Sequence, residues 1–320
     1  MKPPLALTLV FAGCGPTTVV VDDKPGRGSD TAADDSGLDS ADTGSDTGSD
    51  TGTDTADSGD DTDDPDPGPQ TGDCLEYGVV IDQSAHLASG SSFDSFDSTL
   101  GAYGGANVGS VATISLNGDE ACALLNGSTV QGTIAVTGDP EANYCEEWGA
   151  AVSGGVVELV TPATFPVVAT PDVGDNQGDV KLTWGGASTW NADARYEDVS
   201  VAGGSTLSVT RSAIVVVDTL DVAGTISIAE GERLDLYVRG TVNLGWGAAV
   251  NTAGSPGQLR IWVEGVGPVT LAYGSGLNAW VLAPEAPLSH VGTFGGALAV
   301  RELATQWGAA THLDTSVICP

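Results

Sequence analysis

The sequence predicts an all-β protein, a single right-handed parallel β-helix (a β-solenoid) behind a disordered acidic linker. Two observations support this fold class. Short strand-like segments fill residues 74–320, and a Trp-Gly-Ala-Ala sequence recurs along the same stretch. Repeated units that cannot bury an apolar face alone are typical of stacked architectures.

The strand signals are clearest between residues 206 and 282. Apolar and polar residues alternate in short runs, and Gly, Asn, Asp and Pro separate the runs, as expected of strands joined by tight turns. The expected strands are 206–210, 213–217, 225–228, 234–238, 241–244, 259–263, 269–271 and 279–282. The pattern suits either a β-sandwich or a coil of strands, and the Trp repeat favours the coil.

The repeat consists of Trp148-Gly-Ala-Ala-Val, Trp246-Gly-Ala-Ala-Val and Trp307-Gly-Ala-Ala-Thr, with Trp184-Gly-Gly-Ala as a fainter copy. Successive Trp residues are 36, 62 and 61 positions apart. Turns of about 18–21 residues would divide these spacings into two, three and three turns. We therefore expect these Trp at equivalent corners, where the small residues that follow let the chain turn. Chance recurrence in a chain rich in Ala and Gly is the alternative.

The N-terminus carries an export signal, which we assign to residues 1–13. Its apolar run, residues 5–13, is too short to span a bilayer but fits the hydrophobic region of a signal peptide. The sequence Phe11-Ala-Gly-Cys14 resembles the bacterial lipobox. That resemblance implies cleavage before Cys14 and a lipid anchor on it.

Two residues depart from the lipobox pattern: Phe11 stands where Leu is usual, and Lys2 is the one positive charge before the apolar run. An ordinary secretory signal with an incidental Cys is thus the alternative. Gly15 follows the Cys where Asp would favour the inner membrane, so the resemblance implies an outer-membrane location. The expected partner is the membrane, through the lipid on Cys14.

Residues 14–73 are predicted to be a disordered linker. Residues 15–73 hold 17 Asp and no Glu, and no large apolar residue lies between Leu38 and Leu75. Such a segment cannot bury a core. The net charge of −33 argues against nucleic acid as a partner, because phosphate binding needs clustered Lys and Arg.

Four cysteines remain if Cys14 is lipidated, and in an exported protein they predict two disulfides. Three pairings are possible. We favour Cys122–Cys145, which is local in sequence, and Cys74–Cys319, which would join the two ends of the domain. Zinc would need a C-x-x-C motif or nearby His, and neither occurs. We expect no metal and no other cofactor.

Several motifs resemble a family of bacterial surface domains without an assigned function, found on lipoproteins and pilus-associated proteins. They are Phe93-Asp-Ser-Phe-Asp-Ser-x-x-Gly-Ala-Tyr103, the strand-rich segment 199–244, Val281-Leu-Ala-Pro-Glu-Ala-Pro287, Gly295-Gly-Ala-Leu-Ala-Val300 and His312-Leu-Asp314. The closing motif of the family is usually His-Tyr-Asp. The family is similar in style to bactofilin-like and choice-of-anchor solenoids. The resemblance covers about residues 75–315 and implies a parallel β-helix, with no catalytic residue to carry over.

No catalytic motif occurs in the chain: G-x-S-x-G, a P-loop and H-E-x-x-H are all missing. His312 and Asp314 alternate on a predicted strand and would share a face, either as a relay or metal pair or as a hydrogen-bonded cap. Asp94 and Asp97 could bind calcium or cap a turn. We therefore expect no enzyme. A polysaccharide-cleaving β-helix is the least favoured interpretation, because Asp218, Asp221 and Asp235 show no convergent spacing.

The Trp residues of the repeat, Trp148, Trp184, Trp246 and Trp307, are the candidate ligand-binding residues. Aromatic rings on a rigid sheet suit sugar rings, whose apolar faces stack on them. The alternative is that these Trp fill corners of the core. The sequence thus predicts a non-catalytic cell-envelope lipoprotein with a structural or surface-interaction role. Its expected partners are a surface glycan or envelope proteins, and a glycan-binding module or adhesin is the second hypothesis.

Overall fold

The protein forms a parallel β-solenoid of about nine turns in the computed structural model, which describes residues 78–316 except 102, 105–107, 110–111, 118–122, 125–126 and 141–148. The predicted fold class is confirmed. The signal peptide, the acidic linker, Trp148 and all five Cys, residues 14, 74, 122, 145 and 319, lie outside the described residues. Predictions about them remain predictions.

The described residues form 23 strands and two short 3-10 turns. In chain order they are β1 (Val79–Leu87), β2 (Ser92–Phe96), η1 (Ser98–Leu100), β3 (Val108–Gly109), β4 (Ala112–Leu116), β5 (Ala123–Leu124), β6 (Thr129–Val130), β7 (Gly132–Thr137), β8 (Ala151–Val152), β9 (Val156–Leu159), β10 (Val180–Leu182), β11 (Ala187–Trp190), β12 (Ala194–Val201), β13 (Thr206–Val209), β14 (Ala213–Val222), β15 (Thr225–Ile228), β16 (Leu234–Val238), β17 (Val242–Leu244), β18 (Ala249–Val250), η3 (Pro256–Gln258), β19 (Leu259–Val263), β20 (Val269–Leu271), β21 (Gly276–His290), β22 (Thr293–Thr305) and β23 (Ala310–Asp314).

The strands stack into three parallel faces. Face A contains β16, β19 and β4 with the central parts of β21 and β22. Face B contains β10, β17 and β20 with the C-terminal parts of β12 and β14. Face C contains β11, β13, β15, β18 and β23, together with β2. Long strands such as β14 bend from one face into the next.

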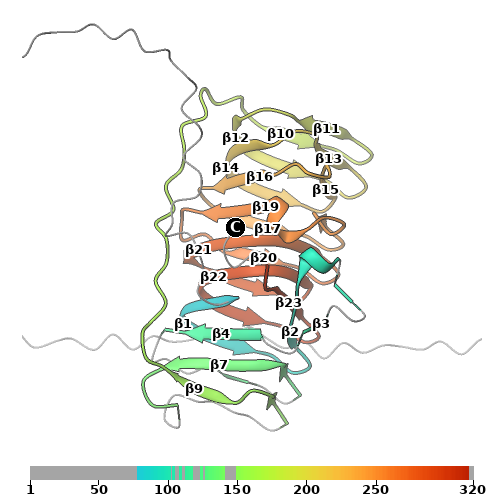
Figure 1. The fold of residues 1–320 in the computed structure, drawn as a ribbon. Coiled ribbons are helices and arrows are strands. Elements are labelled where there is room, and N and C mark those ends of the chain that lie inside the picture. Colours follow the sequence, from blue (N-terminus) through green and yellow to red (C-terminus); the bar gives the residue numbers. More distant parts are fainter. Residues whose placement is uncertain are drawn as a thin grey trace, which may run out of the picture. The chain divides into compact units, whose positions relative to one another are not determined.

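The order of the turns in the stack differs from their order in the chain. β22 pairs with β1 (Leu298 with Val79), and β23 pairs with β2 (Thr311 with Phe93). The N-terminal strands β1–β9 therefore stack beneath the C-terminal strands, and the last strands of the chain lie in the middle of the solenoid. In Figure 1 the blue and green N-terminal strands continue the column directly below the red ones.

One extended segment, residues 160–179, connects the two ends of the stack; we call it the strap. It leaves β9 at one end and reaches β10 at the other, along the side of the column (Figure 1). Ala163, Phe165 and Val168 pack on the outer side of face A, against Trp262, Trp280 and other apolar side chains. This cover explains why every residue of β19, including Arg260, is buried.

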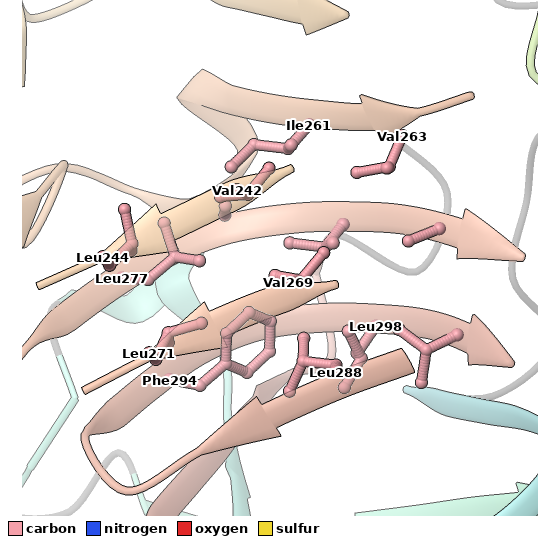
Figure 2. Close-up of a cluster of buried hydrophobic side chains, with 14 of the residues drawn as sticks. Val242, Leu244, Ile261, Val263, Val269, Leu271, Leu277, Leu288, Phe294 and Leu298 are labelled. Carbon is pink, nitrogen blue, oxygen red and sulfur yellow. The ribbon is translucent and has the colours of Figure 1, made fainter. Parts of the chain in front are cut away.

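The interior between the faces is filled by aliphatic side chains in stacked rows. Figure 2 shows such rows, with Val242 and Leu244 of β17 beside Val269 and Leu271 of β20. These residues are at most 1% exposed. Each buried side chain of this size contributes roughly 1.5–3 kcal/mol relative to exposure, so the core gains stability with each added turn.

The predicted strands match the structure closely between residues 206 and 282, where β13 to β17, β19, β20 and part of β21 overlap the expected ranges. The short strand β18 was not predicted, and β14 continues to Val222, beyond its expected end at residue 217. The number of residues per turn varies more than the expected range of about 18–21. It is the distance along the chain between residues that pair in neighbouring turns. Val180 pairs with Val199, Val242 with Val269, and Gly276 with Thr293. The longer turns carry loops outside the core, such as residues 251–258.

The two ends of the described chain meet in the middle of the stack. The backbone oxygen of Gly78 accepts a hydrogen bond from Leu298, and a Cβ on Gly78 would lie 3.3 Å from Leu313. Cys74 and Cys319 lie outside the described residues, and the disulfide between them remains a prediction.

Candidate functional site

One corner of the solenoid, between faces B and C, is built from a repeated backbone turn. A glycine with positive φ occupies the same position in eight turns. These are Gly90, Gly127, Gly149, Gly185, Gly204, Gly247, Gly274 and Gly308, with φ between 71° and 78°. Residues with a Cβ rarely adopt this left-handed conformation. The Gly of each Trp-Gly pair is therefore required by the turn.

Three Trp of the repeat directly precede this glycine and point into solvent. Trp184, Trp246 and Trp307 are 82%, 75% and 73% exposed. Tyr273 takes the same position in the turn after Trp246 and is 66% exposed. We call these four residues the corner ladder. The structure thus places three of the four predicted Trp at equivalent corners, and it excludes a core-filling role for those three.

Each ladder indole lies across the corner of the neighbouring turn. A Cβ on Gly204 would stand 3.3 Å from the Trp184 ring, and one on Gly274 would stand 3.4 Å from Trp246 Nε1. Trp307 lies in the same way over Gly90 of the N-terminal turns. One side of each indole ring packs against the neighbouring corner, and most of the ring surface remains exposed to solvent.

The spacing of the ladder follows from strand register. Trp246 and Tyr273 are in adjacent turns, Tyr273 and Trp307 are two turns apart, and Trp184 lies three turns from Trp246. Neighbouring strands are about 4.8 Å apart, so these steps are about 5, 10 and 14 Å.

The spacing predicted between Trp148 and Trp184, two turns, is wrong. The corner at Gly149 precedes β8, and β8 and β11 lie at opposite ends of the stack, joined through the strap.

The remaining described Trp are buried and have different roles. Trp190 is stacked on Tyr196, whereas Trp262 lies between Tyr237 and Trp280 under the strap. None of the three is followed by Gly. The Trp-Gly pair thus distinguishes the exposed Trp from the buried ones in the described residues.

A groove of about 590 Å³ lies on face C, next to the ladder corner. Its floor is formed by outward-facing residues of β18, β21, β22 and β23, and its sides by residues of the loop 251–258 and by Ser98, Gly101 and Tyr103. The lining residues are Phe96, Ser98, Gly101, Tyr103, Gly247, Ala248, Ala249, Thr252, Ala253, Gly254, Ser255, Pro256, Gly274, Ser275, Gly276, Asn278, Thr293, Gly295 and His312. None of them is Asp, Glu, Lys or Arg.

At one end of the groove, three side chains form a hydrogen-bonded cluster. Asp94 Oδ1 is 2.7 Å from His312 Nδ1, and the Tyr103 hydroxyl donates to Asp94 Oδ2 at 2.6 Å. The rings of Tyr103 and His312 stack with centroids 3.6 Å apart. Burial, followed by the hydrogen bond to Asp94 and the charge of its carboxylate, raises the pKa of Tyr103 to about 12. Tyr103 therefore stays a neutral donor near pH 7.

The sequence placed His312 with Asp314, and the structure gives them separate partners. Asp314 Oδ1 accepts hydrogen bonds from Ser98 N and from Ser316, so it fastens the loop 97–104. Asp97 accepts from Thr99 N and caps η1, as the turn-capping alternative predicted. Asp94 caps no turn, because it pairs across the strands β2 and β23 with His312.

The Asp94–His312 pair was missed because its members lie at opposite ends of the chain. Each belongs to a motif singled out in the sequence, but nothing in the sequence shows that β2 and β23 are neighbours. The remaining acidic candidates have separate partners: Asp218 faces Arg239, Asp221 accepts from Asn243, and Asp235 contacts Arg233 and Arg260.

No group of three or more His, Cys, Asp or Glu placed to hold a metal ion was found among the described residues. This same described part of the chain contains no helix that is long and apolar enough to cross a membrane.

Comparison with known proteins identifies one family. Residues 167–318 match the model of a domain of unknown function (DUF7305), so this part of the solenoid is similar to that family. The matched segment contains His312 but neither Asp94 nor Tyr103. No curated protein and no solved structure gives a significant match.

Proposed function

We propose that this chain is a non-catalytic cell-envelope protein whose solenoid binds carbohydrate along the corner ladder. The observation that carries the proposal is the exposure of Trp184, Trp246, Tyr273 and Trp307 in one line on a rigid corner. Large aromatic rings are costly to leave in water, and exposed apolar surface on a folded protein commonly marks a binding site.

The chemistry of the ladder favours sugar rings as ligands. Indole and phenol faces stack on the apolar CH faces of a sugar, while their polar edges remain available for hydrogen bonds. The backbone turns hold the ladder residues at equivalent positions, and the three Trp rings lie against the neighbouring corners, which limits the conformational entropy lost on binding. A line of rings along the solenoid axis suits an extended chain better than a single compact ligand.

The mutational test compares the full chain with a Trp246→Ala/Trp307→Ala double variant on a glycan array and by calorimetry. Aromatic stacking contributes about 1 kcal/mol per ring beyond area burial, so the double variant should bind about 30-fold more weakly. Val266→Ala is the control, because Val266 is exposed (68%) but lies outside the ladder. Binding that survives in the double variant would contradict the ladder as the binding surface.

The location forms a second part of the proposal. We infer from the lipobox-like sequence that Cys14 carries lipid and that the acidic linker 14–73 tethers the solenoid to the outer membrane. Metabolic labelling with palmitate tests this inference: the native chain should incorporate label and a Cys14→Ala variant should not. Equal labelling of both would refute the anchor.

Two disulfides among the other cysteines are tested by a free-thiol count, which should be zero in the exported domain.

A further inference from the structure

The described residues that line the groove on face C include no Asp, Glu, Lys or Arg, although the chain has a net charge of −33. The carboxylate of Asp94 is hydrogen-bonded to His312 and Tyr103 at one end of the groove. The polar groups of the lining are hydroxyls, an amide and one imidazole, with the rings of Phe96 and Tyr103 beside them. Such a lining has no partner for a charged ligand group, and it matches a ligand that is rich in hydroxyls and uncharged.

The cluster at the end of the groove fixes the chemical character of His312. A carboxylate only accepts hydrogen bonds, so His312 donates to Asp94 from Nδ1, and in the neutral imidazole Nε2 is then the acceptor. The stacked ring of Tyr103 holds the imidazole plane. The His312 side chain is 13% exposed. In its neutral form, His312 therefore presents an oriented acceptor to the groove, suited to a donated hydroxyl proton.

Two glycines, Gly276 and Gly295, form part of the floor of the groove, where they add no side chain. A Cβ on Gly295 would stand 2.5 Å from Asn278 Oδ1, and a Cβ on Gly276 would stand 2.8 Å from Thr252 Cγ2. Both glycines face outward on the same strands that carry Asn278 and Thr293. These glycines therefore make room for the Asn278 and Thr252 side chains, which themselves line the groove.

We propose that this groove is a second subsite of the carbohydrate-binding surface, specific for a neutral saccharide unit whose hydroxyl donates a hydrogen bond to His312 Nε2. The inference rests on the proposed carbohydrate binding, but it concerns different residues. The corner glycines Gly247 and Gly274 line the groove and directly follow the ladder residues Trp246 and Tyr273. A saccharide chain on the ladder can therefore extend into the groove. Tyr103 and Asp94 are positioning residues for His312.

The first experiment records the histidine ring nitrogens of the full chain by NMR, with the neutral hexasaccharides of glucose, mannose and N-acetylglucosamine as probes and hexagalacturonate as the acidic comparison. The chain has three His, which provide internal controls: His86 is exposed on β1, and His290 is buried. We expect at least one neutral probe to shift Nε2 of His312 and leave both control residues unchanged. Hexagalacturonate should bind at least tenfold more weakly.

The second experiment measures affinity by calorimetry for His312→Phe, which keeps a ring against Tyr103 but removes the acceptor. We expect at least a tenfold loss for the neutral probe, and no change for the matched control His86→Phe. Tyr103→Phe should weaken binding less and should broaden or shift the Nδ1 signal of His312, an effect that a purely structural role of the tyrosine ring would not produce.

The outcomes separate the two proposals. If a glycan binds through the Trp residues and the His312 signals never move, the ladder remains and the groove subsite is refuted. Equal binding of the acidic probe refutes the neutral specificity. If no probe binds the wild-type chain, both proposals fail. Shorter sugars in the mixture would show cleavage and overturn the non-catalytic assignment.

Discussion

One side chain makes two of the hydrogen bonds that attach the strap, and its removal gives a quantitative prediction. Asn117, just after β4, donates from Nδ2 to the oxygen of Ala163 at 2.7 Å and accepts from the nitrogen of Ala163 at 2.9 Å. Asn117→Ala removes both bonds. Each hydrogen bond contributes about 1 kcal/mol net, so the free energy that favours the docked strap over the open one should fall by about 2 kcal/mol. This loss corresponds to an approximately 30-fold larger population of strap-open molecules.

The assay is hydrogen exchange read by mass spectrometry. Peptides that contain Phe165 and Val168 should exchange about 30-fold faster in the variant, while strands of the interior keep their protection, because opening is local in a stacked structure. Asn243→Ala is the matched control: Asn243 also makes a side-chain hydrogen bond, to Asp221 on face B, away from the strap. Unchanged exchange in Asn117→Ala would refute the reasoning and assign the attachment to apolar contacts alone.

Three further predictions concern the core and the corners. Gly308→Ala should cost about 1–2 kcal/mol in urea unfolding, because a Cβ there has open space and meets only the penalty of φ = 77°; a neutral result would contradict the corner requirement. Trp280→Ala should cost about 3–5 kcal/mol, since Trp280 is fully buried under the strap, and a loss below about 1 kcal/mol would show that the site collapses. Burial lowers the pKa of His290 to about 4, so its neutral form stabilises the fold above pH 6.5 and that contribution is lost as the pH falls toward 4, by about 3 kcal/mol in total. The stability difference between wild type and His290→Gln, measured from pH 8 to pH 4, should change by that amount, and a constant difference would refute the assignment.

The sequence predicted the local structure of the solenoid well because its signals are local. Alternation of apolar and polar residues located β15 and β19 within the chain, and each Trp-Gly pair marked a corner that needs a left-handed glycine. These features depend only on neighbouring residues. The equal spacing of Trp184, Trp246 and Trp307 in three-turn steps followed from the same local period, although individual turns range widely in length.

The stacking order and the groove could not be predicted in this way. Every turn of a solenoid offers a similar strand edge to its neighbour. The pairing of β1 with β22 therefore cannot be recognised from the local alternation of apolar and polar residues. The Asp94–His312 pair depends on that long-range pairing. The sequence therefore paired His312 with its near neighbour Asp314, on the same strand.

The strands β22 and β23, the last in the chain, lie between the N-terminal turns and the turns from the middle of the chain. This position limits the order in which the solenoid can fold. The turns formed by β1–β9 keep an unpaired edge until β22 and β23 have been synthesised, near the end of the chain, and such an open edge is prone to wrong pairing. A stop codon after residue 292 would not shorten the column from one end. It would remove the middle and leave two separate stacks, connected only by the strap.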